Sequence, residues 1–274
     1  MFARKPAPVQ VTYLAYCSTT GLDTIDYRIT DPYLDPPDDN QRGYSEKSVW
    51  LPNSYWCYEP YIQAPAVGPL PAAQAGHVTF GCLNTFSKVT APTLVTWAEL
   101  LRQVPGSHLV LHASRGDHRR RLLEQFGAQG IDSDRITFVG KVPLEQYLEI
   151  YNQIDIGLDP FPYAGGTTTC DALWMGVPVV SLAGRIAVSR GGLSILSNVG
   201  MPELVAHDRD EYLRIAIKLA GDLARLSEVR SNLRDRMRTS PLMDGRRFAA
   251  DVEAAYRQIW REACDRPVCR ETHH

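Results

Sequence analysis

The most constraining feature of this sequence is a regular alternation between short apolar runs and longer amphipathic stretches, which begins near residue 77. It predicts five strands, at about residues 78–83, 108–113, 136–139, 154–159 and 178–182. Between the first two, a helix is indicated by apolar residues at three- and four-residue spacing, with a capping threonine and a first-turn proline (Leu94, Trp97, Leu101 and Val104; Thr90; Pro92). Strands that alternate with helices pair in parallel and are covered on both faces, so we expect an α/β fold.

The two ends of the chain differ from this alternating region. Three short strands are expected near the N-terminus, at residues 9–16, 25–30 and 47–51. A proline-rich stretch without periodicity follows, and we interpret residues 53–76 as a linker between unequal parts. A last helix is expected over residues 247–260, and its apolar stripe has to dock on another part of the molecule (Phe248, Val252, Ala255, Tyr256, Ile259 and Trp260).

The composition is that of an ordinary globular protein. Of 274 residues, 44% are hydrophobic and 22% charged, and the formal net charge is -2. This balance offers no basic surface for nucleic acid or an anionic membrane, and no stretch approaches the ~20 apolar residues that span a bilayer. We therefore expect a cytoplasmic protein with neither partner. The scattered cysteines lack Cys-x-x-Cys pairs and predict reduced, mostly buried thiols (Cys17, Cys57, Cys82, Cys170, Cys264 and Cys269).

Ligands of a parallel α/β sheet bind at its carboxyl edge, where strands lead into the following helices. The strand at 154–159 is followed by a loop that ends at Gly166, and Thr167, Thr168 and Thr169 then open a helix. A helix N-terminus carries positive charge and free N–H groups, and we expect all three hydroxyls to point to the same place. The segment thus predicts a phosphate site. The simpler alternative for Thr167 alone is a helix cap.

A second loop reaches the same edge of the sheet. Asn84, Thr85 and Lys88 follow the strand at 78–83. The Lys88 ammonium is placed to bind a diphosphate and to stabilise charge on a leaving group. Without the threonine cluster, a solvated surface lysine is the simpler explanation.

Two more loops complete the predicted rim. The loop at 140–143, with Val142, offers backbone groups, and Tyr147 offers a ring suited to a planar base. Plain packing is the simpler explanation for Tyr147. The glycine-flanked segment at 184–192 adds polar groups to the same crevice or is only a connection.

One acidic motif has a different explanation. Asp132-Ser133-Asp134 resembles the Asp-x-Asp pair that binds a divalent metal in many nucleotide-sugar enzymes, but it precedes the strand at 136–139 and is expected at the opposite edge. We therefore predict no metal site. The sequence also lacks the Gly-x-Gly-x-x-Gly, Walker and His-Glu-x-x-His motifs, so nothing favours a dehydrogenase or a hydrolase.

At these residues the chain resembles the C-terminal catalytic region of the protein O-linked N-acetylglucosamine (O-GlcNAc) transferase and SPINDLY family, glycosyltransferase family 41, in its bacterial form. The most specific match is Thr167-Thr-Thr-Cys-Asp-Ala-Leu-Trp-Met-Gly-Val-Pro178. Further matches occur in the same order as in the family and cover nearly the whole chain. They lie at residues 5–10, 19–21, 26–27, 30–31, 44–47, 80–88, 158–163, 189–190 and 240–242.

The resemblance implies a two-lobed glycosyltransferase of GT-B type that inverts the anomeric centre without a metal or other cofactor. It implies a complete, Rossmann-like C-terminal lobe and only the end of an incomplete N-terminal lobe. We expect the N-terminal remnant at residues 1–52, the linker at 53–76 and the nucleotide-sugar-binding lobe at 77–246. At 247–274 we expect a helix that packs back towards the N-terminal lobe, and a tail.

The implied activity is transfer of N-acetylglucosamine (GlcNAc) from UDP-GlcNAc to serine or threonine hydroxyls of a protein or peptide. By resemblance, Lys88 contacts the diphosphate and stabilises the departing UDP, and Thr167 and Thr168 bind its phosphates. Asp171 would bind the ribose, and Val142 would offer backbone contacts to uracil.

Departures from the family keep two alternatives open. The family usually has Gly-Tyr-Pro-Gly-Thr-Thr-Gly where this chain has Ala15-Tyr-Cys-Ser-Thr-Thr-Gly21. Thr85 replaces a common glutamine or asparagine, and Tyr147 replaces a histidine that often lies over the base. A relative that uses GDP-fucose or UDP-glucose is therefore one alternative. Family members also carry upstream tetratricopeptide repeats and the first half of the N-terminal lobe, so a nucleotide-sugar-binding fragment, inactive alone, is the other.

Overall fold

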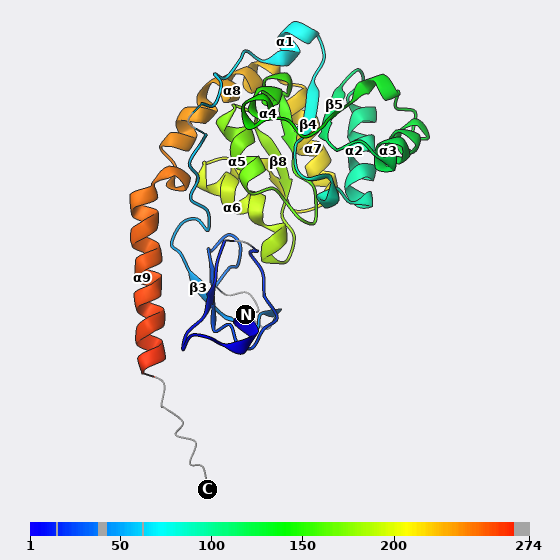
Figure 1. Cartoon of the computed structure of the whole chain (residues 1–274). Helices are drawn as coiled ribbons and strands as arrows, with labels where there is room; N and C mark the ends of the chain where they lie inside the picture. Colours follow the sequence, from blue (N-terminus) through cyan, green and yellow to red (C-terminus); the bar gives the residue numbers. More distant parts are fainter. Residues whose placement is uncertain (15, 38–42, 62, 266–274) are drawn as a thin grey trace.

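The computed structural model describes residues 1–14, 16–37, 43–61 and 63–265. Ala15, Cys269 and the tail from residue 266, which entered the sequence predictions, lie outside this part. The molecule has a larger α/β part, a small N-terminal sheet below it and a long C-terminal helix beside that sheet (Figure 1). The strands are β1 (Val11–Thr12), β2 (Tyr27–Thr30), β3 (Lys47–Trp50), β4 (Thr79–Cys82), β5 (His108–His112), β6 (Ile136–Val139), β7 (Ile156–Leu158), β8 (Val179–Leu182) and β9 (Val205–Ala206). The α-helices are α1 (Pro71–Ala75), α2 (Ala91–Gln103), α3 (Asp117–Gly127), α4 (Leu144–Ile150), α5 (Thr167–Trp174), α6 (Gly191–Asn198), α7 (Arg209–Ala220), α8 (Leu223–Arg238) and α9 (Gly245–Cys264).

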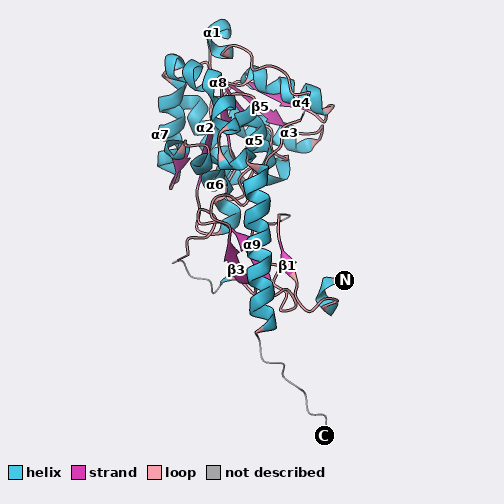
Figure 2. Cartoon of the chain, turned by 90° about the vertical axis from the view of Figure 1, so that its left-hand side faces the viewer, coloured by secondary structure: helices cyan, strands magenta, loops and turns pink. Residues whose placement is uncertain are grey.

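The larger sheet has six parallel strands in the order β6-β5-β4-β7-β8-β9, and helices flank it (Figures 1 and 2). All five strands predicted for this region are confirmed. The edge strand β9 is too short for its periodicity to show in the sequence. The order places the loops after β4 and β7, which are neighbours, side by side at the carboxyl edge.

The predicted helix after β4 is confirmed as α2. The Thr90 side chain accepts a hydrogen bond from the Thr93 N–H, and Pro92 lies in the first turn. Trp97 is fully buried, and its indole N–H donates to the Tyr212 hydroxyl at 3.1 Å. This bond joins the middle of α2 to α7.

The N-terminal sheet has three parallel strands in the order β1-β2-β3. The strand expected at residues 9–16 is wrong in its length, because only Val11–Thr12 pair with β2. Leu14 has a φ of 71°, in the left-handed region, which takes the chain out of the extended conformation. This turn directs the following residues, Tyr16 and Cys17, towards the larger part of the molecule.

Helix α9 packs on this small sheet. Ala255 and Ile259 are buried in a cluster with Tyr27, Ile29, Val49 and Leu51, and Phe248 and Val252 pack against it. The predicted stripe is therefore only partly right: Tyr256 and Trp260 point away and are 46% and 59% exposed. The helix joins the end of the chain to its beginning.

Buried carboxylates hold the two parts together and organise the small sheet. Asp31 accepts hydrogen bonds from the Tyr55 N–H and from the Ser194 hydroxyl of α6, at 2.7 and 2.5 Å. On the other face of the sheet, Arg28 pairs with Asp35 at 2.7 Å, and both side chains are almost completely buried. The bond from Ser194 to Asp31 therefore docks the N-terminal sheet on the larger part, whereas the Arg28–Asp35 pair ties β2 to the loop that follows it.

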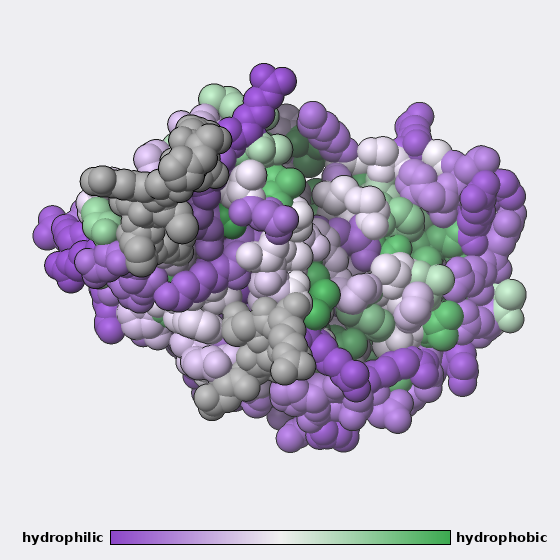
Figure 3. Space-filling model, turned by 90° about the horizontal axis from the view of Figure 1, so that it is seen from below, coloured by the Kyte–Doolittle hydropathy of each residue, from purple (hydrophilic) through white to green (hydrophobic). Residues whose placement is uncertain are grey.

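The outside of the molecule agrees with its composition. The face seen from below is rimmed by hydrophilic side chains, and hydrophobic ones form separate patches (Figure 3). Within the described ranges, no helix is both long and apolar enough to cross a membrane. Five cysteines there are free thiols, of which Cys17, Cys82 and Cys170 are buried.

Candidate functional site

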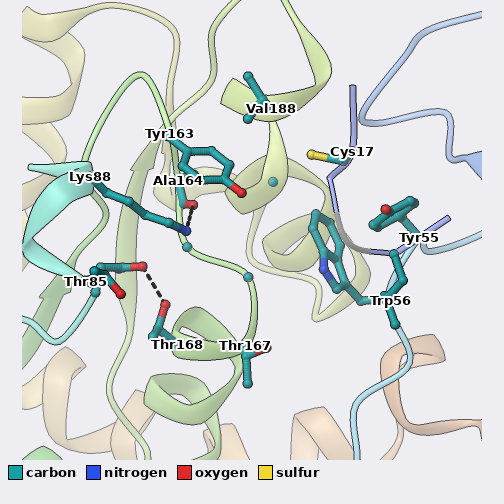
Figure 4. Close-up of a pocket in the computed structure, with 15 residues that line it drawn as sticks. Cys17, Tyr55, Trp56, Thr85, Lys88, Tyr163, Ala164, Thr167, Thr168 and Val188 are labelled. Carbon is teal, nitrogen blue, oxygen red and sulfur yellow. Dashed lines mark hydrogen bonds between the residues drawn. The ribbon is translucent and has the colours of Figure 1, made fainter. Parts of the chain in front are cut away.

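A cavity of about 240 Å³ lies at the carboxyl edge of the larger sheet, where the N-terminal part faces it (Figure 4). It is bordered by the loops after β4 and β7 and by the start of α6. Asn84, Thr85, Lys88, Gly166, Thr167 and Thr168 line it together, as do Leu14, Cys17, Tyr55, Trp56, Tyr163, Ala164, Gly165, Val188 and Gly191. Six of the nine predicted site residues thus meet in one place, and the loop at 184–192 contributes to the same rim.

The loop between β7 and α5 is built around the buried carboxyl of Asp159. Its Oδ1 accepts from the Gly165 N–H at 3.3 Å and from the Thr169 hydroxyl at 2.9 Å. A Cβ on Gly165 would lie 2.1 Å from the Thr169 Oγ1, so only glycine fits there. The expectation that all three threonine hydroxyls point to one place is therefore wrong for Thr169, whose hydroxyl turns inward because Asp159 needs a donor.

The other two threonines face the cavity. Gly166 is the residue that caps α5, so the alternative that Thr167 is merely the cap is also wrong. The Thr168 hydroxyl donates to the Asn84 Oδ1 at 2.7 Å, which ties the loops after β4 and β7 together. Asn84 is buried and bonded to Thr168, whereas Thr167 is exposed at the start of α5, where the first N–H groups of a helix have no partner within the helix.

Lys88 ends the short 3₁₀ helix η3 (Phe86–Lys88) and points across the cavity (Figure 4). Its Nζ donates to the Ala164 carbonyl at 3.1 Å and lies 3.9 Å from the centre of the Tyr163 ring. Burial lowers the pKa of Lys88, and the nearby Asp159 carboxyl opposes this shift. The ammonium is thus brought to the same cavity as the amino end of α5, as the sequence argument requires.

The opposite wall comes from residues that the sequence analysis missed. Tyr55 and Trp56 lie in the stretch interpreted as a linker, and the Trp56 ring packs on two glycines of the site. A Cβ at Gly166 or Gly191 would come within 3.4 or 3.3 Å of this ring. The aromatic pair in an otherwise proline-rich stretch is the sequence signal that could have revealed this wall.

Three predicted residues do not line the cavity. Asp171 lies one turn farther along α5, where its carboxyl accepts from the Tyr58 hydroxyl at 2.8 Å. The Tyr147 hydroxyl lies beside the same carboxyl and is hydrogen-bonded to the Tyr151 hydroxyl at 2.8 Å. Burial raises the pKa of Asp171 to about 6. Val142 packs, half-buried, against the core.

The acidic motif at residues 132–134 leads into the amino end of β6, away from the cavity, as predicted. Across the part of the chain with described coordinates, no three His, Cys, Asp or Glu side chains are grouped as a metal site needs.

The family model described as glycosyl transferase family 41 matches residues 1–60 and 70–252. The chain belongs to this family. It is 44% identical over 98% of its length to a Petunia hybrida protein and 43% identical over 96% to an Arabidopsis thaliana protein, both named probable UDP-N-acetylglucosamine–peptide N-acetylglucosaminyltransferase SPINDLY. A second Arabidopsis relative, named SEC, is 30% identical over 96% of the chain.

A solved family structure supports the fold. A mutant of Thermobaculum terrenum O-GlcNAc transferase superposes with a TM-score of 0.88 at 37% identity, over 96% of this chain and 50% of its own. The predicted α/β, GT-B-type fold class is thereby confirmed. This family 41 chain spans only 29% of the length of the Petunia and Arabidopsis SPINDLY proteins.

Proposed function

We propose that this chain is the donor-binding part of a protein O-GlcNAc transferase, which moves GlcNAc from UDP-GlcNAc to serine or threonine hydroxyls of a protein or peptide. One observation carries the proposal: the Lys88 ammonium and the amino end of α5 line the same cavity. The names of the family 41 relatives, which specify this donor and a peptide acceptor, support it.

The proposed chemistry uses positive groups of the protein. Transfer breaks the bond between the anomeric carbon and the β-phosphate oxygen, while the acceptor oxygen bonds to that carbon from the opposite face and releases its proton to water. Negative charge therefore grows on the departing UDP. Lys88, the Thr167 hydroxyl and the first N–H groups of α5, that of Thr168 among them, stabilise this charge, while the Thr168 hydroxyl stays bonded to Asn84. Because the loops already hold these groups in place, they favour the transition state without reorganisation and without a metal.

The nucleoside is proposed to follow α5. Asp171 lies four residues after Thr167, one helical turn away on the same helix, so it can accept a hydrogen bond from the ribose while Thr167 holds a phosphate. Backbone groups at Val142 are proposed for uracil, with the Tyr147 ring beside it. Thr85 lies exposed on the phosphate side of the site.

The length of the chain favours a second candidate function. Because it spans 29% of its SPINDLY relatives, the isolated chain could bind a nucleotide sugar and still need further residues, including an upstream tetratricopeptide portion, for turnover. A donor of GDP-fucose or UDP-glucose is the corresponding alternative for specificity. In either case we expect a cytoplasmic protein whose partners are the donor and a protein acceptor, not nucleic acid or a membrane.

Nucleotide binding tests the proposal. Millimolar UDP is expected to raise the melting temperature, since a ligand bound at 100 times its dissociation constant stabilises a fold by about 2.7 kcal/mol. Lys88→Ala removes a charged hydrogen-bond donor, so the UDP affinity should fall roughly tenfold to a hundredfold. Lys218→Ala, which changes an exposed lysine on α7, is the matched control.

A second measurement separates the candidates. Titration with GDP and with UDP shows which nucleotide base the chain binds. Incubation of the chain with UDP-GlcNAc and a serine-containing peptide shows whether it transfers the sugar. Glycosylated peptide supports the enzyme, and binding without product supports the binding module. If neither nucleotide shifts the melting temperature, both candidates are wrong.

A further inference from the structure

Two neighbouring residues of the β7–α5 loop hold the Lys88 ammonium from different directions. The Ala164 carbonyl accepts one of its three N–H groups at 3.1 Å, and the face of the Tyr163 ring lies 3.9 Å from the nitrogen. Figure 4 shows the Tyr163 ring above the Lys88 ammonium and Thr168 below it. The two contacts leave N–H groups of Lys88 for a ligand in the cavity.

The loop that carries Tyr163 is fixed at both ends. The hydroxyls of Thr90 and Thr93 both donate to the Phe161 carbonyl, each at 2.8 Å. The Gly165 N–H donates to Asp159. The ring is therefore presented by a rigid support and does not depend on Lys88 for its position.

The ring also touches the N-terminal part of the molecule. Tyr163 packs against the cluster of Cys17, Ala187 and Val188, and the Tyr16 ring meets it edge-on at a centroid distance of 6.3 Å. Tyr163 is thus held by contacts with other parts of the chain as well as by its contact with Lys88.

The contact with the Tyr163 ring stabilises the positive charge of Lys88. Lys88 is partly buried, which disfavours its charged form, and Asp159 is the carboxyl that favours it. The electron-rich face of an aromatic ring attracts a cation most strongly where water is partly excluded. The Tyr163 ring therefore offsets part of the free energy lost when the ammonium is buried. It carries no net charge, so it leaves the positive charge of Lys88 available, whereas a carboxylate in contact with Lys88 would neutralise that charge.

We infer that Tyr163 is a positioning residue for the transfer: its ring keeps the Lys88 ammonium charged and aimed at the diphosphate. The effect of Tyr163 on transfer rests on the proposed function, but its contact with Lys88 can be tested without nucleotide. Tyr163 is assigned no contact with the donor. Its hydroxyl takes no part, so phenylalanine should replace it fully.

The test follows the Lys88 pKa by NMR of protein labelled with carbon-13 lysine, which is practical because the sequence has five lysines (Lys5, Lys47, Lys88, Lys141 and Lys218). Lys88→Arg identifies the resonance. Tyr163→Phe should leave the Lys88 pKa unchanged and the UDP affinity within about twofold of wild type. Phenylalanine analogues with increasing fluorination, introduced at Tyr163, keep the ring's shape but weaken its negative face.

The fluorinated series should lower the Lys88 pKa stepwise and weaken UDP binding by about threefold to tenfold, in proportion to the strength of a cation–π contact. Asp159, Cys17 and Cys82, the other titratable groups around Lys88, are the same in every variant. Tyr61→Phe, at an exposed tyrosine, is the control.

Failure of the inference about Tyr163 and failure of the proposed function give different results. If the Lys88 pKa stays constant across the fluorinated series, Tyr163 does not position Lys88 and the inference is overturned. If Tyr163→Phe lowers the pKa as much as full fluorination does, the hydroxyl matters and the inference is also wrong. If the pKa follows the series but no variant binds UDP, including wild type, the inference about Lys88 stands and the proposed function fails.

Discussion

The carboxyl of Asp171 gives the sharpest quantitative prediction. It is largely buried beside the Tyr58 hydroxyl, and burial raises its pKa from 3.8 to about 6. At 1.36 kcal/mol per pKa unit, this difference corresponds to about 3 kcal/mol, an upper value because the group keeps some contact with water. Ionised Asp171 is therefore a cost to the ligand-free fold.

The direction of the pH effect follows from proton binding. Between pH 3.8 and about 6 the folded chain holds this proton more tightly than the unfolded chain, so the contribution of Asp171 to stability falls as pH rises through this window. Asp171→Asn keeps a neutral acceptor for Tyr58 and loses the titration. The variant should match wild type near pH 4 and be more stable by up to about 3 kcal/mol above pH 6.5.

Urea unfolding of both proteins at half-unit pH steps measures this difference, with Asp23→Asn as an exposed control. Nucleotide binding should move in the opposite direction, because the ionised carboxylate is the better acceptor for a ribose hydroxyl. UDP should bind wild type more tightly at pH 7 than at pH 5 and bind Asp171→Asn weakly at both. A stability difference that is constant from pH 4 to 7 would refute this account of Asp171.

Two further predictions concern the framework of the site. Arg28→Met leaves the buried Asp35 carboxyl without its cation and should lower the free energy of unfolding, measured in urea, by about 3–5 kcal/mol. A loss below about 1 kcal/mol would contradict the buried ion pair. Gly192→Ala places a Cβ 1.9 Å from the Ser181 Oγ and should lower the free energy of unfolding by about 1–3 kcal/mol. In the control variant, Gly127→Ala, the added Cβ meets nothing within 4 Å and should not lower it. Equal melting temperatures for these two variants would contradict the packing at α6.

Much of the site could be predicted from the sequence because it depends on local order. Strand and helix periods predict the parallel sheet, and the sheet's geometry requires the loops after β4 and β7 to meet at one edge. That is why Lys88 and Thr167, distant in sequence, could be assigned to one cavity before their positions were known. The residue types then indicated a site for an anion.

The direction of individual side chains could not be predicted, because it depends on contacts across the fold. Thr169 is as polar as Thr167 in the sequence, yet Asp159 draws its hydroxyl inward, since a buried carboxylate must be hydrogen-bonded. The placement of Trp56 against Gly166 and Gly191 likewise depends on the packing of Trp56 and Tyr58 against the core of the larger part. Periodicity and chain direction are local properties, so the order of residues is enough to predict which elements form and which loops share an edge. Burial and hydrogen bonding join residues far apart in the chain, so the hydroxyls and rings that face the cavity are known only once the chain is folded.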